Sequence, residues 1–216
     1  MNFRPTFKCH SKKYTKEAST TIGINVSAKC EVRTLIEKML YELANQHASD
    51  AKEAHENGKL SNSELSHSLQ TIILAAACLE AFINQKAIEI LKEEFALYDK
   101  GIIDAYGKKL PPKSGHPGLE NKWCDITKRI CGRTFNRGEQ PFQDFNELLE
   151  LRNYILHYKA TSVPPVPSPR KDISGYVTSE RAKLTSQTAQ EAVKSMKEMI
   201  KEFHDLTKQK LPNWVK

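Results

Sequence analysis

Apolar residues recur every three or four positions over most of this chain, which is the period of an amphipathic helix. The first such stretch begins near residue 28, and its apolar stripe consists of Val32, Leu35, Ile36, Met39 and Leu43. The same stretch continues to Gly58, a residue type that commonly ends helices. The sequence therefore predicts a first helix that begins near residue 28 and stops before Gly58.

A second and longer helix is predicted over about 62–98. Ser61, Asn62 and Ser63 offer caps for its N-terminus. Its centre, TIILAAACLEAFI at 71–83, is apolar on nearly every face. This run is too short to span a bilayer, and it carries Glu80. We therefore expect a core helix surrounded by other helices, and no membrane segment.

Three further helices are predicted in the second half of the chain. The first covers about 119–131, and the second covers about 141–160 and opens at Pro141. The proline-rich stretch 161–170 should end that helix and run extended. The last helix, about 178–209, carries a stripe of Val193, Met196, Ile200 and Phe203.

Two segments lack the helical period. Residues 99–118 hold four glycines and three prolines, which indicates a long loop. Residues 1–27 show only short apolar–polar alternations and are assigned to an arm or hairpin. The expected fold is all-α, a four- to five-helix bundle with long loops and a short non-helical N-terminal arm. The expected helical domain covers residues 28–210.

Composition adds a partner class and a compartment. The 216 residues carry a formal net charge of +7 and a pI of about 9.1, which favours a polyanionic partner. The first residues, MNFRPTFKCHSKKY, lack the apolar region of a secretory signal. Five cysteines without a CxxC pair indicate reduced thiols. We expect a cytoplasmic protein.

An arginine interrupts the apolar face of the helix predicted at 141–160. Spacings of three and four place five residues on that face: Phe142, Phe145, Leu149, Arg152 and Leu156. An arginine at a core-like position must be paired or must line a wet cleft. His157 follows five residues later, about 140° around a straight helix. Asn153 lies one turn before His157.

At these residues the chain resembles the HEPN superfamily of small all-α domains. The segment RNYILH at 152–157 is similar to the motif of its ribonucleases, in which an arginine and a polar residue are followed by a histidine after three to five further residues. The segment AACLEAFINQKAIEIL at 76–91, with Glu80 and Asn84 one turn apart, looks like the long central helix of such domains. The resemblance implies a metal-independent endoribonuclease that dimerises with its two motifs facing each other. It also implies a defence or toxin–antitoxin context, and some members are non-catalytic binding modules.

The chemistry of RNA cleavage by its own 2′-hydroxyl suits these side chains. Arg152 presents a planar fork that can hold a phosphate and stabilise its developing charge. His157 is the natural acid or base near neutral pH. Asn153 and Glu80 could orient these groups. Asn84 lies one helical turn after Glu80, and Tyr154 is a candidate for base stacking or hydrogen bonding. One histidine does not easily serve both ends of the reaction, and a homodimer would supply a second.

Other interpretations remain open at this stage. Arg152 could be a structural arginine paired with Glu80 inside the bundle, and His157 an ordinary helix-end histidine. Cys9, His10 and Cys30 are too few and too far apart for a favoured zinc site. The glycines of 99–118 lack the spacing of a nucleotide cradle. We expect no cofactor and no metal. The expected partners are RNA, a second copy of the chain, and an antitoxin or other partner protein.

Overall fold

The computed structural model forms a helical bundle, which confirms the all-α expectation. It describes residues 18–57, 62–111, 115–157, 166–167, 176–177 and 183–215, with the backbone alone for 18–35, 166–167 and 176–177. Its helices and strands are α1 (Ala18–Glu56), α2 (Asn62–Leu91), η1 (Lys92–Glu94), α3 (Phe95–Asp99), α4 (Leu119–Cys131), α5 (Phe142–Leu156), β1 (Val166–Pro167), β2 (Tyr176–Val177) and α7 (Ser186–Thr207).

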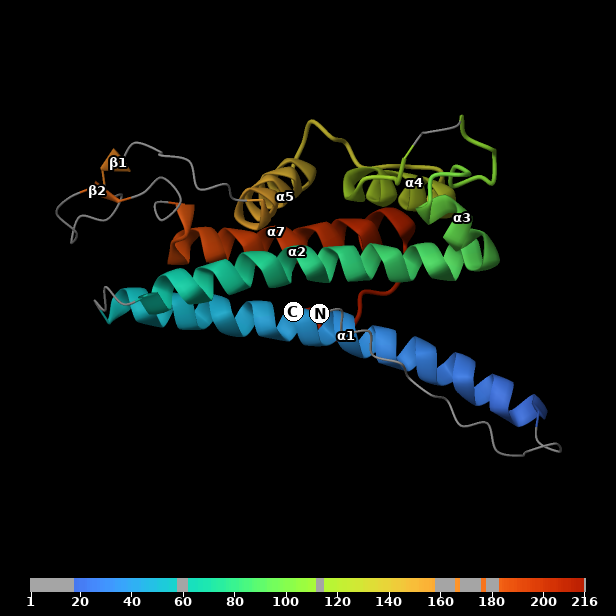
Figure 1. Cartoon of the computed structure of the whole chain (residues 1–216), viewed down its shortest axis with the longest axis horizontal. Coiled ribbons are helices and arrows are strands. Elements are labelled where there is room, and N and C mark those ends of the chain that lie inside the picture. Colours follow the sequence, from blue (N-terminus) through green and yellow to red (C-terminus); the bar gives the residue numbers. More distant parts are fainter. Residues whose placement is uncertain are drawn as a thin grey trace, which may run out of the picture.

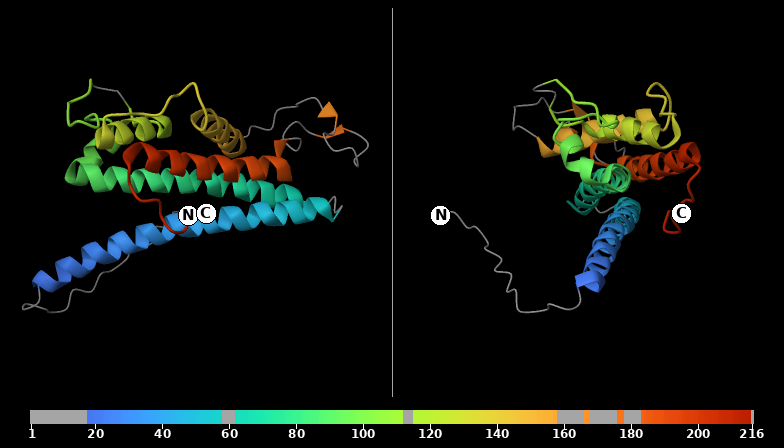
Figure 2. Two further views of the ribbon diagram at one scale, coloured as in Figure 1. Left: turned by 180° about the vertical axis from the view of Figure 1, so that it is seen from behind. Right: turned by 90° about the vertical axis from the view of Figure 1, so that its right-hand side faces the viewer.

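The helices form three layers around α2. Helix α1 lies along one side of α2, α7 runs beside α2, and α4 and α5 cover the opposite side (Figure 1). Seen from the end, the same order of layers is visible (Figure 2). Helix α2 contacts α1, α4, α5 and α7, as expected for a helix that is apolar on nearly every face.

An aromatic cluster fills the centre of the bundle. The Trp123 side chain of α4 is fully buried and stacks on Phe82 of α2 with the ring centroids 5.5 Å apart. The rings of Phe145 on α5 and Phe203 on α7 lie 5.9 Å from it. His204 packs against Phe82 and Phe203, and its burial lowers the pKa of its imidazole. The indole ring of Trp123 on α4 therefore contacts aromatic side chains of three other helices, α2, α5 and α7.

Helix α1 differs from the expectation in two ways. It begins at Ala18, so helix replaces the last ten residues of the expected arm at 1–27; residues 1–17 lie outside the described part of the chain. The part of its predicted stripe whose side chains the structure describes also faces solvent, because Ile36, Met39 and Leu43 are 41%, 51% and 39% exposed. The face that packs on the bundle carries Glu37, Tyr41, Ala44, Ala48 and Ala51. Small alanines let α1 approach α2 closely, so that backbone fit decided which face is buried.

The second predicted helix ends earlier than expected. Helix α2 stops at Leu91, Lys92 adopts a positive φ of 49°, and the short segments η1 and α3 follow. A left-handed residue ends the regular helix because it turns the next peptide out of the hydrogen-bonding ladder. Among the described residues, the Asn62–Asp99 stretch alone is long and apolar enough to cross a membrane. Half of its apolar window is buried inside the bundle.

The loop expected at 99–118 has defined structure where it is described. Asp104 accepts hydrogen bonds from the backbone N–H groups of Tyr106 and Lys108, and Ile103 pairs with Lys109 in an antiparallel bridge. Gly101 has a φ of 67°, and a Cβ there would lie 1.7 Å from the carbonyl oxygen of Gly115. Only glycine allows this close approach of two backbone segments.

Of the remaining helices, α4 and α5 agree with the pattern, and α7 begins later than expected. Helix α4 covers the predicted 119–131, and α5 ends at Leu156 inside its predicted span. Helix α7 begins at Ser186 rather than near 178, after the two-residue strands β1 and β2 pair antiparallel. The backbone N–H of Ser186 donates to the buried carboxylate of Glu64, which the His55 imidazole also contacts at 3.1 Å. This carboxylate therefore links α1, α2 and α7.

Candidate functional site

The structure brings Arg152 and Glu80 together from two helices. Arg152 Nη2 of α5 lies 3.5 Å from Glu80 Oε2 of α2. The side chain of Arg152 is 23% exposed and that of Glu80 is 50% exposed. The pair predicted from the sequence is therefore present, but it lies at the margin of the bundle and stays in contact with water. Such a pair contributes little to stability.

The position of Arg152 follows from how the buried face of α5 ends. Phe142, Phe145, Leu148 and Leu149 are buried, whereas Leu156 is 54% exposed. The apolar face thus reaches the surface near Arg152, and Leu156 does not belong to the core as the spacing predicted. An arginine suits this boundary because its methylene stem covers apolar surface while the guanidinium remains hydrated.

His157 lies at the C-terminal end of α5. Its backbone N–H donates to the carbonyl oxygen of Asn153 at 2.9 Å, and both side chains are exposed. No hydrogen bond or ion pair joins Arg152 to His157 in the part of the chain that the structure describes. The two side chains are close in sequence and both reach solvent, so a ligand would have to bridge them.

Two of the predicted supporting residues contact other groups. The Tyr154 ring lies under Lys183, with Nζ 4.5 Å from the ring centroid. Asn84 accepts a hydrogen bond from Lys122 of α4 at 3.0 Å, and Lys122 also contacts Asp99 at 2.6 Å. Asn84 is therefore part of the contact between α2 and α4, although it lies one turn from Glu80.

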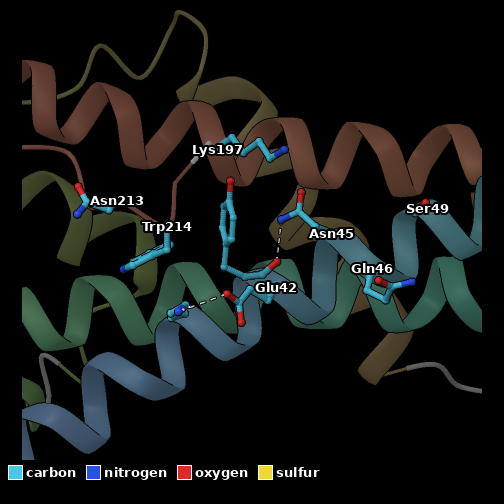
Figure 3. Close-up of a pocket in the computed structure, with 9 residues that line it drawn as sticks. Glu42, Asn45, Gln46, Ser49, Lys197, Asn213 and Trp214 are labelled. Carbon is cyan, nitrogen blue, oxygen red and sulfur yellow. Dashed lines mark hydrogen bonds and ion pairs between the residues drawn. The ribbon is translucent and has the colours of Figure 1, made fainter.

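A hollow that the sequence did not indicate lies between α1, α7 and the C-terminal segment (Figure 3). It has a volume of 570 Å³. Trp214 and Asn213 face Lys197 of α7 and Glu42 and Asn45 of α1 across it (Figure 3).

Aromatic rings and a lysine give this hollow its chemistry. The rings of Tyr41 and Trp214 meet edge to face with centroids 5.2 Å apart, and Lys197 Nζ lies 5.9 Å from the Tyr41 centroid. Tyr41 is only 5% exposed, so the partly exposed Trp214 ring is the surface on which a base could stack, and Lys197 could attract a phosphate. The only sequence signal was a single tryptophan near the C-terminus, in NWVK. That signal says nothing about α1, which supplies the other wall.

The cysteines add no site in the described part of the chain. Cys78 and Cys124 are buried free thiols, and Cys131 is a partly exposed one. The thiol hydrogen of Cys131 is directed at the backbone carbonyl of Thr127. Of the three residues weighed for zinc, Cys9 and His10 lie outside the described residues, as does the side chain of Cys30.

Comparison with known proteins identifies no relative. No family model matches the chain, and neither a curated protein nor a solved structure matches it. The functional argument therefore rests on the residues and their geometry.

Proposed function

We propose that this chain is a metal-independent endoribonuclease of the HEPN type. It cleaves RNA by attack of the 2′-hydroxyl and leaves a 2′,3′-cyclic phosphate. The observation that carries the proposal is that the Arg152–Glu80 pair stays in contact with water and that the exposed His157 follows Arg152 by five residues, at the end of α5. A defence or toxin–antitoxin role, with an antitoxin as partner, follows from the resemblance and belongs to the same proposal. A cytoplasmic location, expected from the first residues and the cysteines, is also part of it.

Arg152 binds the scissile phosphate in this proposal. A guanidinium carries several N–H donors. Glu80 contacts Arg152 at Nη2, so the other N–H groups remain available for phosphate oxygens. Glu80 fixes the orientation of the fork, as a supporting carboxylate does in a preorganised site. A cation held in this way meets the negative charge that develops on the pentavalent phosphorus.

His157 transfers protons, and a second copy supplies the other histidine. Attack by the 2′-hydroxyl needs a base, and departure of the 5′-oxygen needs an acid. Each chain has one histidine at this place, so a homodimer across the end of α5 would provide both groups. The 54% exposed Leu156, directly before His157, is an apolar side chain that such an interface would cover.

RNA cleavage in EDTA at neutral pH tests the proposal. Wild type should cut mixed single-stranded RNA, and Arg152→Ala and His157→Ala should each lower the rate at least about 100-fold. The exposed residues Arg133 and His116 provide matched controls, and their alanine variants should cleave like wild type. The products should end in a 2′,3′-cyclic phosphate.

Two outcomes would contradict the proposed nuclease function. The first is cleavage by His157→Ala at the wild-type rate, which would place the activity elsewhere. The second is a folded wild type that leaves every RNA of a broad panel intact. Substrates with a 2′-deoxy sugar at the cut site should resist cleavage, because the attacking group is then missing.

The second candidate function is binding of single-stranded RNA without catalysis. The hollow with the partly exposed Trp214 and Lys197 favours it, because aromatic rings that stack bases and cations that attract phosphates are the usual means of holding single strands. In this alternative Arg152 is a structural residue at the edge of α5.

An RNA analogue that cannot be cleaved separates the two candidates. For a fluorescent 2′-O-methyl oligonucleotide, the binding function predicts that Trp214→Ala and Lys197→Gln each weaken affinity about 10-fold. Arg152→Ala should then bind like wild type. The nuclease predicts the opposite pattern, with affinity lost in Arg152→Ala and retained in the other two. Thermal unfolding of each variant checks that it is folded.

A further inference from the structure

Two histidines and an aspartate meet where α1 packs against α2. His47 and Asp50 lie one turn apart on α1, and His67 lies opposite them on α2. The Nδ1 atoms of the two histidines are 3.1 Å apart. Asp50 Oδ2 lies 3.8 Å from Nδ1 of His47 and 3.9 Å from Nδ1 of His67. The three potential ligand atoms thus lie within 4.8 Å of one another.

The separation of the two nitrogens fits two ligands of one metal ion. Bonds of about 2.0–2.1 Å place neighbouring ligands about 2.9–3.4 Å apart in octahedral or tetrahedral geometry. The carboxylate oxygen is about half an ångström further away than that. Because Asp50 is 29% exposed, a small rotation of its carboxylate can bring the oxygen closer.

A neighbouring side chain orients the aspartate for this role. Gln46 Nε2 donates to Asp50 Oδ1 at 2.8 Å, which leaves Oδ2 directed toward the histidines. Hydrogen bonds of this kind to a ligating carboxylate fix its orientation in metal sites. The three ligand side chains are between 22% and 29% exposed, so an ion can reach them and keep water in its open positions.

The position of the cluster separates it from the proposed RNA site. His67 and Glu80 are both on α2, and 13 positions along a helix correspond to about 20 Å. The cluster therefore does not belong to the Arg152 site. It also differs from the His55–Glu64 contact, in which one imidazole pairs with one carboxylate.

We propose that His47, Asp50 and His67 form a binding site for a divalent transition metal ion, with Zn²⁺ as the preferred ion. Two imidazoles and one carboxylate suit zinc, whereas Mg²⁺ and Ca²⁺ prefer oxygen ligands alone. The ion joins α1 to α2 through side chains from both helices. The site is independent of the proposed nuclease, which needs no metal.

Calorimetric titration of the full chain with ZnCl₂, after removal of metals by EDTA and dialysis, tests the proposal. Wild type should bind one Zn²⁺ per chain with a Kd of about 1 μM or lower, and its Tm should rise with zinc. His67→Ala should weaken binding at least about 100-fold, and Gln46→Ala about 10-fold. His55→Ala removes a histidine of α1 that lies outside the cluster, and this variant should bind zinc like wild type.

A second variant guards against loss of folding. Asp50→Asn changes a partly exposed group and should remain folded, yet it should weaken zinc binding about 10-fold because the carboxylate charge is lost. Wild type that binds no zinc at 100 μM would overturn the proposal, as would His67→Ala with wild-type affinity. The two measurements are zinc binding and thermal stability. They do not depend on RNA cleavage, so failure of the proposed nuclease activity would leave this result unaffected.

Discussion

Replacing Trp123 with alanine is expected to lower the free energy of unfolding by about 4 kcal/mol. The indole is fully buried on α4 and contacts aromatic rings from three other elements of the bundle. Phe82 stacks on it, and Phe135, Phe145 and Phe203 meet it at centroid distances of 5.8–5.9 Å. The cavity left by alanine would lie where these layers join, and rigid helices on every side would limit its collapse.

Urea unfolding followed by circular dichroism measures this loss. Trp123→Phe should cost much less, since it keeps an aromatic ring. It also removes an indole N–H that has no acceptor among the described residues. Trp214→Ala is the matched control, because Trp214 is only partly buried at the edge of the fold. A loss below about 1 kcal/mol for Trp123→Ala would contradict the central place of this ring.

Replacing Glu37 with glutamine is expected to stabilise the protein by about 5 kcal/mol at pH 9 and by almost nothing at pH 4. Glu37 is 5% exposed on the inner face of α1, and its Oε1 has no hydrogen-bond partner among the described residues. Burial raises the pKa of its carboxyl from 4.5 to about 8, Lys86 lowers that pKa, and Glu89 raises it. Glutamine keeps the shape and stays neutral at every pH.

The direction of the pH dependence follows from the two states of Glu37. Below pH 4.5 the carboxyl is protonated in both the folded and the unfolded chain. Between pH 4.5 and 8 the unfolded chain releases the proton while the folded chain retains it, so stability falls as the pH rises. Above pH 8 the buried carboxylate is ionised and its cost is complete.

Unfolding free energies at pH 5, 7 and 9 test this expectation. The difference between Glu37→Gln and wild type should grow with pH. Glu42→Gln is the control, since that side chain is 61% exposed on the same helix and should follow wild type. Equal pH profiles for Glu37→Gln and wild type would refute it. His204 changes stability in the opposite direction, because its lowered pKa makes the folded protein less stable as the pH falls below 6.5. This loss of stability at low pH should be the same in Glu37→Gln and in wild type.

The sequence by itself determined the helices, the core helix and one contact between helices. The helical period and the signals at the helix ends were sufficient to predict the bounds of α4. These signals lie in residues close together along the chain, so the sequence alone carries them. An apolar run on all faces was sufficient to place α2 at the centre. The arginine within an apolar stripe predicted a paired or hydrated Arg152, and Glu80 is its partner. For the helices themselves, neighbouring residues along one helix carry the information; for Arg152, the apolar stripe around it indicated that it needs a partner or water.

Only the tertiary structure decided which faces meet. Ile36, Met39 and Leu43 form the stronger apolar stripe of α1, yet Glu37 faces the bundle, since the alanines beyond it set the approach to α2. Twenty residues separate His47 from His67, and the register between two helices brings their nitrogens to 3.1 Å. A period identifies a face of a helix, whereas the contact between two faces depends on the shape of both. The metal site proposed here therefore could not be predicted from the sequence.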